Sequence, residues 1–222
     1  MAYSQDYIKR MIEQMGEFLL AIKNNTREER YDEALDGVNE AFKALLGMDS
    51  DFINSTPDDY LVLMTSLNSG GDASKCQMLA DLLDAKAEVH ELRGEYEQSE
   101  SLYLKALNVL TQVALQLAHK PMADHIERVQ MFVDKLEEGE SELPLRTKDR
   151  LFQFYERIGQ FALAENMMFD MLSAAPDEEQ EGAISEGGVA FYNRLLGYTD
   201  HELEEGGLPR TEVQEGLREL TV

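Results

Sequence analysis

The chain has 222 residues, and its 44 acidic and 20 basic residues give a formal net charge of −24. This excess of acid argues against direct binding to nucleic-acid phosphates, which requires Lys and Arg, and against an anionic membrane surface. A basic partner is compatible with it, although solubility in an acidic cytoplasm is the simplest explanation and mimicry of nucleic acid a third.

The composition predicts an all-α protein. Pro is scarce, with five residues, and apolar residues make up 43% of the chain, which argues against disorder. The single cysteine, Cys76, rules out an internal disulfide and fits a reducing compartment. The first residues lack the basic start and apolar core of a signal peptide, and no apolar run approaches the ~20 residues of a membrane span. We therefore expect a soluble, cytoplasmic protein.

The first predicted hairpin covers residues 5–47. Its first helix is amphipathic, since apolar residues recur at helical spacing. These residues are Ile8, Met11, Ile12, Met15, Leu19 and Ile22. Thr26 is the expected N-cap of the second helix, which runs to Gly47. An additional helix is predicted over 57–68, because Thr56 and Pro57 followed by two acids form a strong start signal.

The central hairpin, residues 73–119, has the clearest pattern. Apolar residues of its first helix alternate spacings of three and four and therefore share one side. They are Met78, Leu82, Ala85, Val89 and Leu92. Gly94 provides the turn, and the second helix begins near Tyr96. Small side chains at Ser99 and Ala106 resemble those of the tetratricopeptide repeat, which needs them where paired helices approach closely. Lys86 departs from that motif, which has a large apolar residue there, and Thr111 replaces its usual final Pro.

This pattern occurs three times. The turn positions Glu29, Gly94 and Gly159 are 65 residues apart in each case, and small residues follow at Ala34, Ser99 and Ala164. A plain tetratricopeptide array repeats at about 34 residues, so each hairpin is expected to be followed by additional helices. These are 57–68 and, after the central hairpin, 122–138. The third hairpin covers 146–175, and the three form the predicted helical-repeat body, 1–176.

Residues 177–222 are predicted to form an acidic, helical C-terminal segment. We interpret it as a cap on the open end of a solenoid; an acidic tail that docks elsewhere is the alternative. The repeated hairpins and the run AFYNRLLGYTDHELEEGGLPRTEVQEGL resemble a bacterial family of small acidic helical proteins of unknown function. The resemblance spans nearly the whole chain and implies an all-helical fold without an assigned activity.

No residue pattern indicates catalysis. The four histidines, His90, His119, His125 and His201, lack the spacing of a zinc protease and a third ligand, so neither a metal nor a cofactor is expected. Cys76 has no neighbouring histidine in sequence and is interpreted as a buried structural thiol. We therefore predict that the protein is not an enzyme.

The candidate site is an acidic face of the central hairpin's first helix. Asp81, Asp84, Glu88 and Glu91 are spaced three, four and three residues apart, which places four carboxylates on one face. In the tetratricopeptide family, the corresponding positions line a concave groove that holds extended peptides. The resemblance thus implies a groove that favours a basic or mixed segment. An ordinary solvated face is the alternative.

Three functions follow from these patterns. The first is a non-catalytic scaffold or adaptor that binds a protein or peptide. The second is a structural homo-oligomer, for example a dimer, that pairs through an apolar flank such as Phe191-Tyr192. The third is a small-ligand sensor or an enzyme with a pocket between the hairpins and the additional helices, where His and carboxylate groups would converge.

Overall fold

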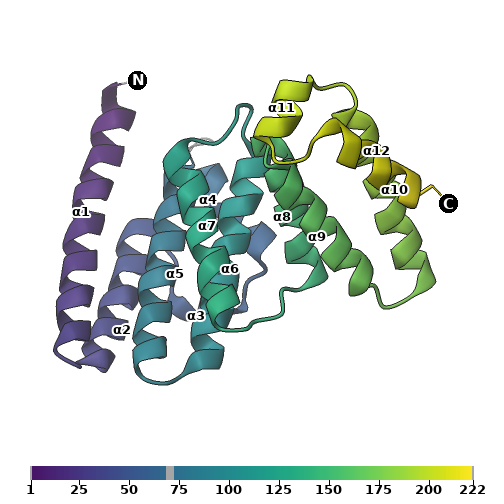
Figure 1. The fold of residues 1–222 in the computed structure, drawn as a ribbon. Helices are drawn as coiled ribbons and strands as arrows, with labels where there is room; N and C mark the ends of the chain where they lie inside the picture. Colours follow the sequence, from purple (N-terminus) through teal and green to yellow (C-terminus); the bar gives the residue numbers. More distant parts are fainter. Residues whose placement is uncertain (1, 69–72, 222) are drawn as a thin grey trace. The chain divides into compact units, whose positions relative to one another are not determined.

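The structure is a computed structural model that describes residues 2–68 and 73–221, and within these ranges every regular element is a helix (Figure 1). The all-α prediction is therefore confirmed. The chain forms two compact units: unit 1 is Met1–Val113 with Met122–Glu142, and unit 2 is Ala114–Pro121 with Leu143–Val222. The predicted boundary after residue 176 coincides with none of the three points at which the chain passes between these units. The predicted division into a repeat body and a C-terminal cap stays a prediction.

Unit 1 contains the first seven α-helices, with only the end of α6 outside it. They are α1 (Ala2–Arg27), α2 (Tyr31–Ala41), α3 (Ser50–Ser55), α4 (Asp58–Asn68), α5 (Ser74–Leu92), α6 (Tyr96–Gln116) and α7 (Ala123–Glu138). The α2 helix continues into a π-helical turn, η1 (Phe42–Leu46), which stops at Gly47 with a φ of +69°. The additional helices that the sequence predicts at 57–68 and 122–138 correspond to α4 and α7.

Unit 2 contains the remaining helices. They are α8 (Leu145–Ile158), α9 (Phe161–Ser173), α10 (Glu178–Leu195), α11 (Asp200–Glu205) and α12 (Arg210–Glu219). Side-chain caps define the starts of α10 and α11: the Asp177 carboxylate accepts from Gln180 N–H, and Thr199 and Glu202 form a reciprocal capping box. The C-terminal helices contact α9 directly, since Ala162 N–H donates to the Gly206 carbonyl at 3.0 Å.

The three predicted turn positions adopt the same backbone conformation. Glu29, Gly94 and Gly159 have φ values of +58°, +78° and +79°. At each turn one N–H donates to the carbonyl three residues back and the next N–H to the carbonyl five residues back, which is the Schellman motif. The longer bonds are Arg30 to Asn25, Glu95 to His90 and Gln160 to Tyr155, at 2.9, 2.8 and 2.9 Å. The three turn positions that are equally spaced in the sequence thus have the same backbone conformation and hydrogen-bond pattern.

Small side chains lie where the paired helices meet. Ala34 on α2, Ser99 on α6 and Ala164 on α9 are all buried, with 3% or less of their surface exposed. The α1–α2 and α8–α9 pairs run side by side (Figure 1). In the central pair, the Tyr103 hydroxyl of α6 donates to the Glu91 carboxylate of α5 at 2.8 Å. A large side chain at any of the three positions would force the helices apart.

Each unit has its own core. In unit 1, α2, η1 and α5 provide fully buried residues such as Val38, Phe42 and Leu83. In unit 2, Phe191 packs edge-on against Phe152 at 5.2 Å between ring centroids, and the buried Tyr192 donates to Glu165 at 2.6 Å. The homo-oligomer hypothesis proposed Phe191-Tyr192 as an exposed flank, and this is wrong because both side chains are fully buried.

One local prediction needs correction, and one helix was not predicted. Thr26 is not an N-cap: it lies inside α1, and its hydroxyl donates to the Ile22 carbonyl at 2.9 Å. The second helix starts at Tyr31, after the Glu29 turn. The helix α3 was not predicted, because six residues are too few for a periodic pattern.

Among the described helices, none has the length and apolar character needed to cross a lipid bilayer.

The turn conformation predicts how substitutions in unit 1 change stability. Gly94→Ala is expected to destabilise the protein by about 1 kcal/mol, because a Cβ strains the left-handed region although it meets no neighbouring atom there. Glu29→Gly is expected to stabilise by up to about 1 kcal/mol, since it relieves the same strain. Urea unfolding of the full chain measures both changes.

Gly16→Ala is the matched control for the Gly94→Ala and Glu29→Gly variants. Gly16 lies within α1, away from neighbouring atoms and outside the left-handed region, so the added Cβ should stabilise by about 1 kcal/mol. Equal signs for Gly94→Ala and Gly16→Ala would contradict the turn assignment.

Candidate binding face on α5

The four predicted acidic residues lie on one face of α5. The opposite side of this helix carries Leu79, Leu82 and Leu83, all fully buried, which fixes the rotation of α5 in unit 1. Asp81 and Asp84 are half-buried, whereas Glu88 and Glu91 are exposed. Leu92 was placed on the apolar side with Val89, but it is 55% exposed, because it ends the helix beside the turn.

Two clefts adjoin along this face. The first, which we call the α1 cleft, lies between α1, α5 and Arg128 of α7 and has a volume of about 360 Å³. The second, the α6 cleft, lies between α5, α6 and α7 and has a volume of about 590 Å³. Glu88 and Leu92 line both clefts, so the two clefts adjoin at these residues, and we call them together the strip. Asp81 and Asp84 line the α1 cleft, and Glu91 lines the α6 cleft.

Cations from α7 neutralise part of the acidic face. Arg128 Nη1 lies 2.6 Å from Asp81 Oδ1, and Lys135 Nζ lies 2.5 Å from Asp84 Oδ1. Lys135 also lies over the Tyr103 ring, 4.5 Å from its centroid. These two partners were not predicted from the sequence. Arg128 and Lys135 are seven residues apart and so share one face of the predicted helix 122–138, but this spacing does not indicate which carboxylates they contact.

Burial perturbs the ionisation of two groups here. Desolvation raises the pKa of Asp81; the charge and hydrogen bond of Arg128 oppose this rise, and the Asp84 charge adds to it. Desolvation, together with the hydrogen bond to Glu91, raises the pKa of the Tyr103 phenol. Tyr103 therefore stays a neutral donor and holds Glu91 in place on the face.

The charge balance differs between the two clefts. In the α1 cleft, Lys23 and Arg27 of α1 join Arg128, so three cations face the three carboxylates of Asp81, Asp84 and Glu88. In the α6 cleft, Lys135 faces four carboxylates. These are Glu88, Glu91, Glu100 and Glu138. The strip is thus mixed at one end and acidic at the other, and it is less uniformly negative than the four residues alone indicate.

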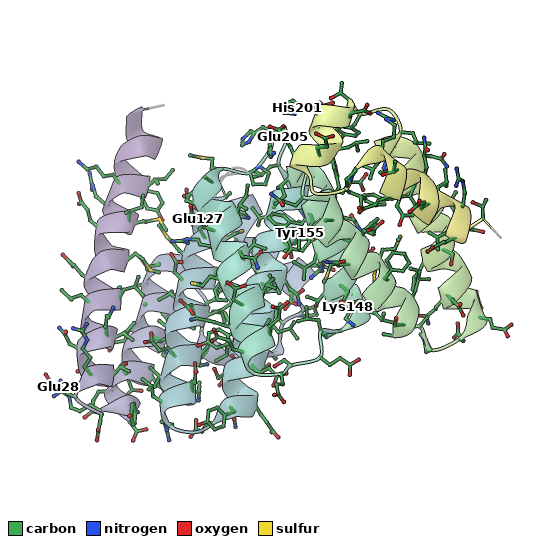
Figure 2. All side chains as sticks on the ribbon, in the orientation of Figure 1. Glu28, Glu127, Lys148, Tyr155, His201 and Glu205 are labelled. Atoms are coloured by element: carbon green, nitrogen blue, oxygen red, sulfur yellow. The ribbon has the colours of Figure 1, made fainter. Side chains whose placement is uncertain are left out.

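The histidines and the cysteine form no shared centre. His90 Nδ1 lies 2.5 Å from Glu95 Oε2, and His125 Nε2 donates to the Leu110 carbonyl at 3.0 Å. His201 and Glu205 are neighbours on α11, with Nε2 and Oε1 3.6 Å apart (Figure 2). Cys76 is buried, with Sγ 2.9 Å from Thr65 Oγ1. Across residues 2–68 and 73–221, no three His, Cys, Asp or Glu side chains converge as metal ligands.

The fold and this face define a class of all-helical protein with a charged, cleft-bearing surface. Residues 2–222 match the family of unknown function DUF6483, and the chain belongs to this family. The family resemblance expected from the sequence is thereby confirmed, whereas its bacterial source and tetratricopeptide character stay predictions. No curated protein and no solved structure matches the chain.

The Arg128 contact predicts the titration of Asp81. Arg128→Met removes the guanidinium that opposes desolvation, so the pKa of Asp81 should rise further above its ordinary value. Carboxylate ¹³C NMR of the full chain across a pH series measures it. Lys135→Met is the control, because Lys135 pairs with Asp84, and it should move the Asp81 pKa less. An Asp81 pKa that falls in Arg128→Met would contradict the assignment.

Proposed function

We propose that the protein is a non-catalytic binding module that holds a basic, partly apolar segment of another protein along the α5 face. The observation that carries this proposal is the α6 cleft, where carboxylates outnumber cations beside exposed apolar surface. Tyr96 and Leu92 at its edge are 69% and 55% exposed. A Lys or Arg side chain has an apolar stem, which matches the exposed apolar surface, and a charged head, which matches the carboxylates.

The carboxylates of the α6 cleft differ in whether another group of the protein already contacts them. Glu91 accepts a hydrogen bond from Tyr103, and Lys135 is held between Asp84 and the Tyr103 ring. Glu88, Glu100 and Glu138 have no ion-pair partner among the described residues. A partner's cations would therefore meet three carboxylates without displacing an internal pair. Exposed pairs are individually weak, so several contacts must act together.

We further propose that the helix pairs form a tetratricopeptide-like solenoid with the C-terminal helices as its cap, in a cytoplasmic protein. Three identical turns at equal spacing and three buried small residues support this arrangement. The contact of α9 with Gly206 supports the cap. In such an arrangement, the first helices of successive pairs line one surface, and α1 and α5 both border the α1 cleft.

Fluorescence anisotropy with three labelled peptides tests the binding proposal. The peptides share length and apolar residues and carry Lys, Ser or Glu at the remaining positions. The Lys peptide is expected to bind the full chain, more weakly as salt increases, and the Glu peptide is not. Glu88→Gln and Glu100→Gln should each weaken binding about threefold, as expected for exposed ion pairs.

Glu179→Gln is the matched control for these variants. Glu179 is an exposed acid in the first turn of α10 in unit 2, and its replacement makes the same change in net charge. Equal losses in Glu88→Gln and Glu179→Gln would mean that only the overall charge of the protein attracts the peptide, and this would contradict a site on α5.

A further inference from the structure

A third cleft of unit 1 contains a buried lysine. The cleft lies between α2, α3, α5 and α6, with a volume of about 600 Å³, and we call it the Lys86 cleft. Lys86 of α5 lies at its base and is only 8% exposed. Asn39 of α2 and Ser50 and Asn54 of α3 provide polar groups around it. This is the position at which the sequence departs from the tetratricopeptide motif by placing a charge where an apolar residue is expected.

The contacts of Lys86 are long and uncharged. Its Nζ donates to Ser50 Oγ at 3.2 Å and to Asn54 Oδ1 at 3.4 Å. The Ser50 hydroxyl in turn donates to Asn39 Oδ1, so its hydrogen is not available to other acceptors. No carboxylate lies within ion-pair distance of Nζ in the described part of the chain. An ammonium group has three donors, and these two contacts use two of them, so the third can donate to a ligand in the cleft.

The buried ammonium group of Lys86 has no counter-ion in contact with it among the described residues. Burying a charge away from a counter-ion costs free energy, and a methylene chain alone would fill this position better. Desolvation accordingly lowers the pKa of Lys86, while the charge of Asp51 opposes that effect. An anion that reached Nζ through the cleft would accept its remaining hydrogen and supply a counter-charge.

We propose that the Lys86 cleft binds a small organic carboxylate, with a carboxylate oxygen accepting from Lys86 Nζ and the Asn39, Ser50 and Asn54 side chains around it. The site lies apart from the α5 face that we propose for protein binding, and neither proposal requires the other. It is built from two helix pairs and α3 within unit 1.

The other charged groups of the cleft narrow the class of ligand. His90 is bonded to Glu95, and Lys105 donates to the Thr56 carbonyl at 2.8 Å and pairs with Asp58 at 3.3 Å. Asp51 and Glu97 are exposed on the lining. These two acids favour a ligand that also carries a hydroxyl or ammonium donor, and they repel ions with several negative charges. The expected ligand is thus a hydroxy- or amino-substituted monocarboxylate, in preference to a phosphate.

NMR titration of the full chain with labelled lysine tests this proposal. The Lys86 Cε–Hε signal is assigned by its absence from Lys86→Met, and glycolate, glycine and inorganic phosphate are the probes. Glycolate and glycine should shift the Lys86 signal to saturation, and phosphate should bind about tenfold more weakly, because its second charge meets Asp51 and Glu97.

Three variants separate the site from general charge effects. Binding is measured in each by isothermal titration calorimetry. Lys86→Met should fold, since an unbranched apolar side chain fits the position, and it should bind glycolate about tenfold more weakly. Glu97→Gln removes a like charge from the exposed rim and should strengthen glycolate binding about twofold. Lys135→Met, in the α6 cleft, should leave it unchanged.

Two results would overturn the proposal. The first is a Lys86 signal that neither glycolate nor glycine moves. The second is a folded Lys86→Met variant that binds both probes as tightly as the wild-type protein. Should Lys86→Met fail to fold, glycolate binding that Glu97→Gln does not strengthen would also count against the site.

Discussion

Close approach of paired helices is the constraint on which the rest of this structure depends. Each pair needs a residue in the left-handed conformation at its turn and a small buried side chain one turn into the second helix. Gly94 and Ser99 meet these needs in the central pair, and the buried leucines of α5 then fix how this helix is rotated. That rotation directs the leucines of α5 into the core and the acids from Asp81 to Glu91 towards the two clefts. It also directs Lys86 towards α3.

The α5 face and the Lys86 cleft differ in how the protein compensates their charged groups. On the α5 face, the carboxylates of Glu88 and Glu91 are exposed to solvent. Those of Asp81 and Asp84 are half-buried, and each pairs with a cation from α7. In the Lys86 cleft the buried group is a cation, and the chain supplies only neutral oxygens in contact with it. Internal ion pairs therefore compensate the half-buried carboxylates of the α5 face, whereas the exposed carboxylates of the α6 cleft and the buried amine of Lys86 have no ion-pair partner among the described residues. For this reason, we propose a basic partner for the exposed α6 cleft and a small carboxylate for the buried amine.

Much of the fold could be predicted from the sequence, because helices and turns depend on local patterns. Periodic apolar residues located the long helices, and equal spacing located the turns at Glu29, Gly94 and Gly159. Contacts between distant residues were harder to predict. The pairing of Arg128 with Asp81 joins helices almost fifty residues apart, and nothing local to either residue indicates it. The anomaly at Lys86 was visible in the motif, but its meaning depends on α3, which is too short to show a period.

The location of a bound peptide tests the central claim most directly. A Lys-rich peptide that carries a nitroxide spin label, added to protein with ¹³C-labelled leucine methyl groups, broadens the signals of nearby residues. We expect the strongest loss of signal at Leu19 and Leu92, which line the α1 cleft, and a weaker loss at Leu63, an exposed leucine of α4 that lines neither cleft of the α5 face. Broadening at Leu63 without broadening at Leu92 would contradict a binding face on α5.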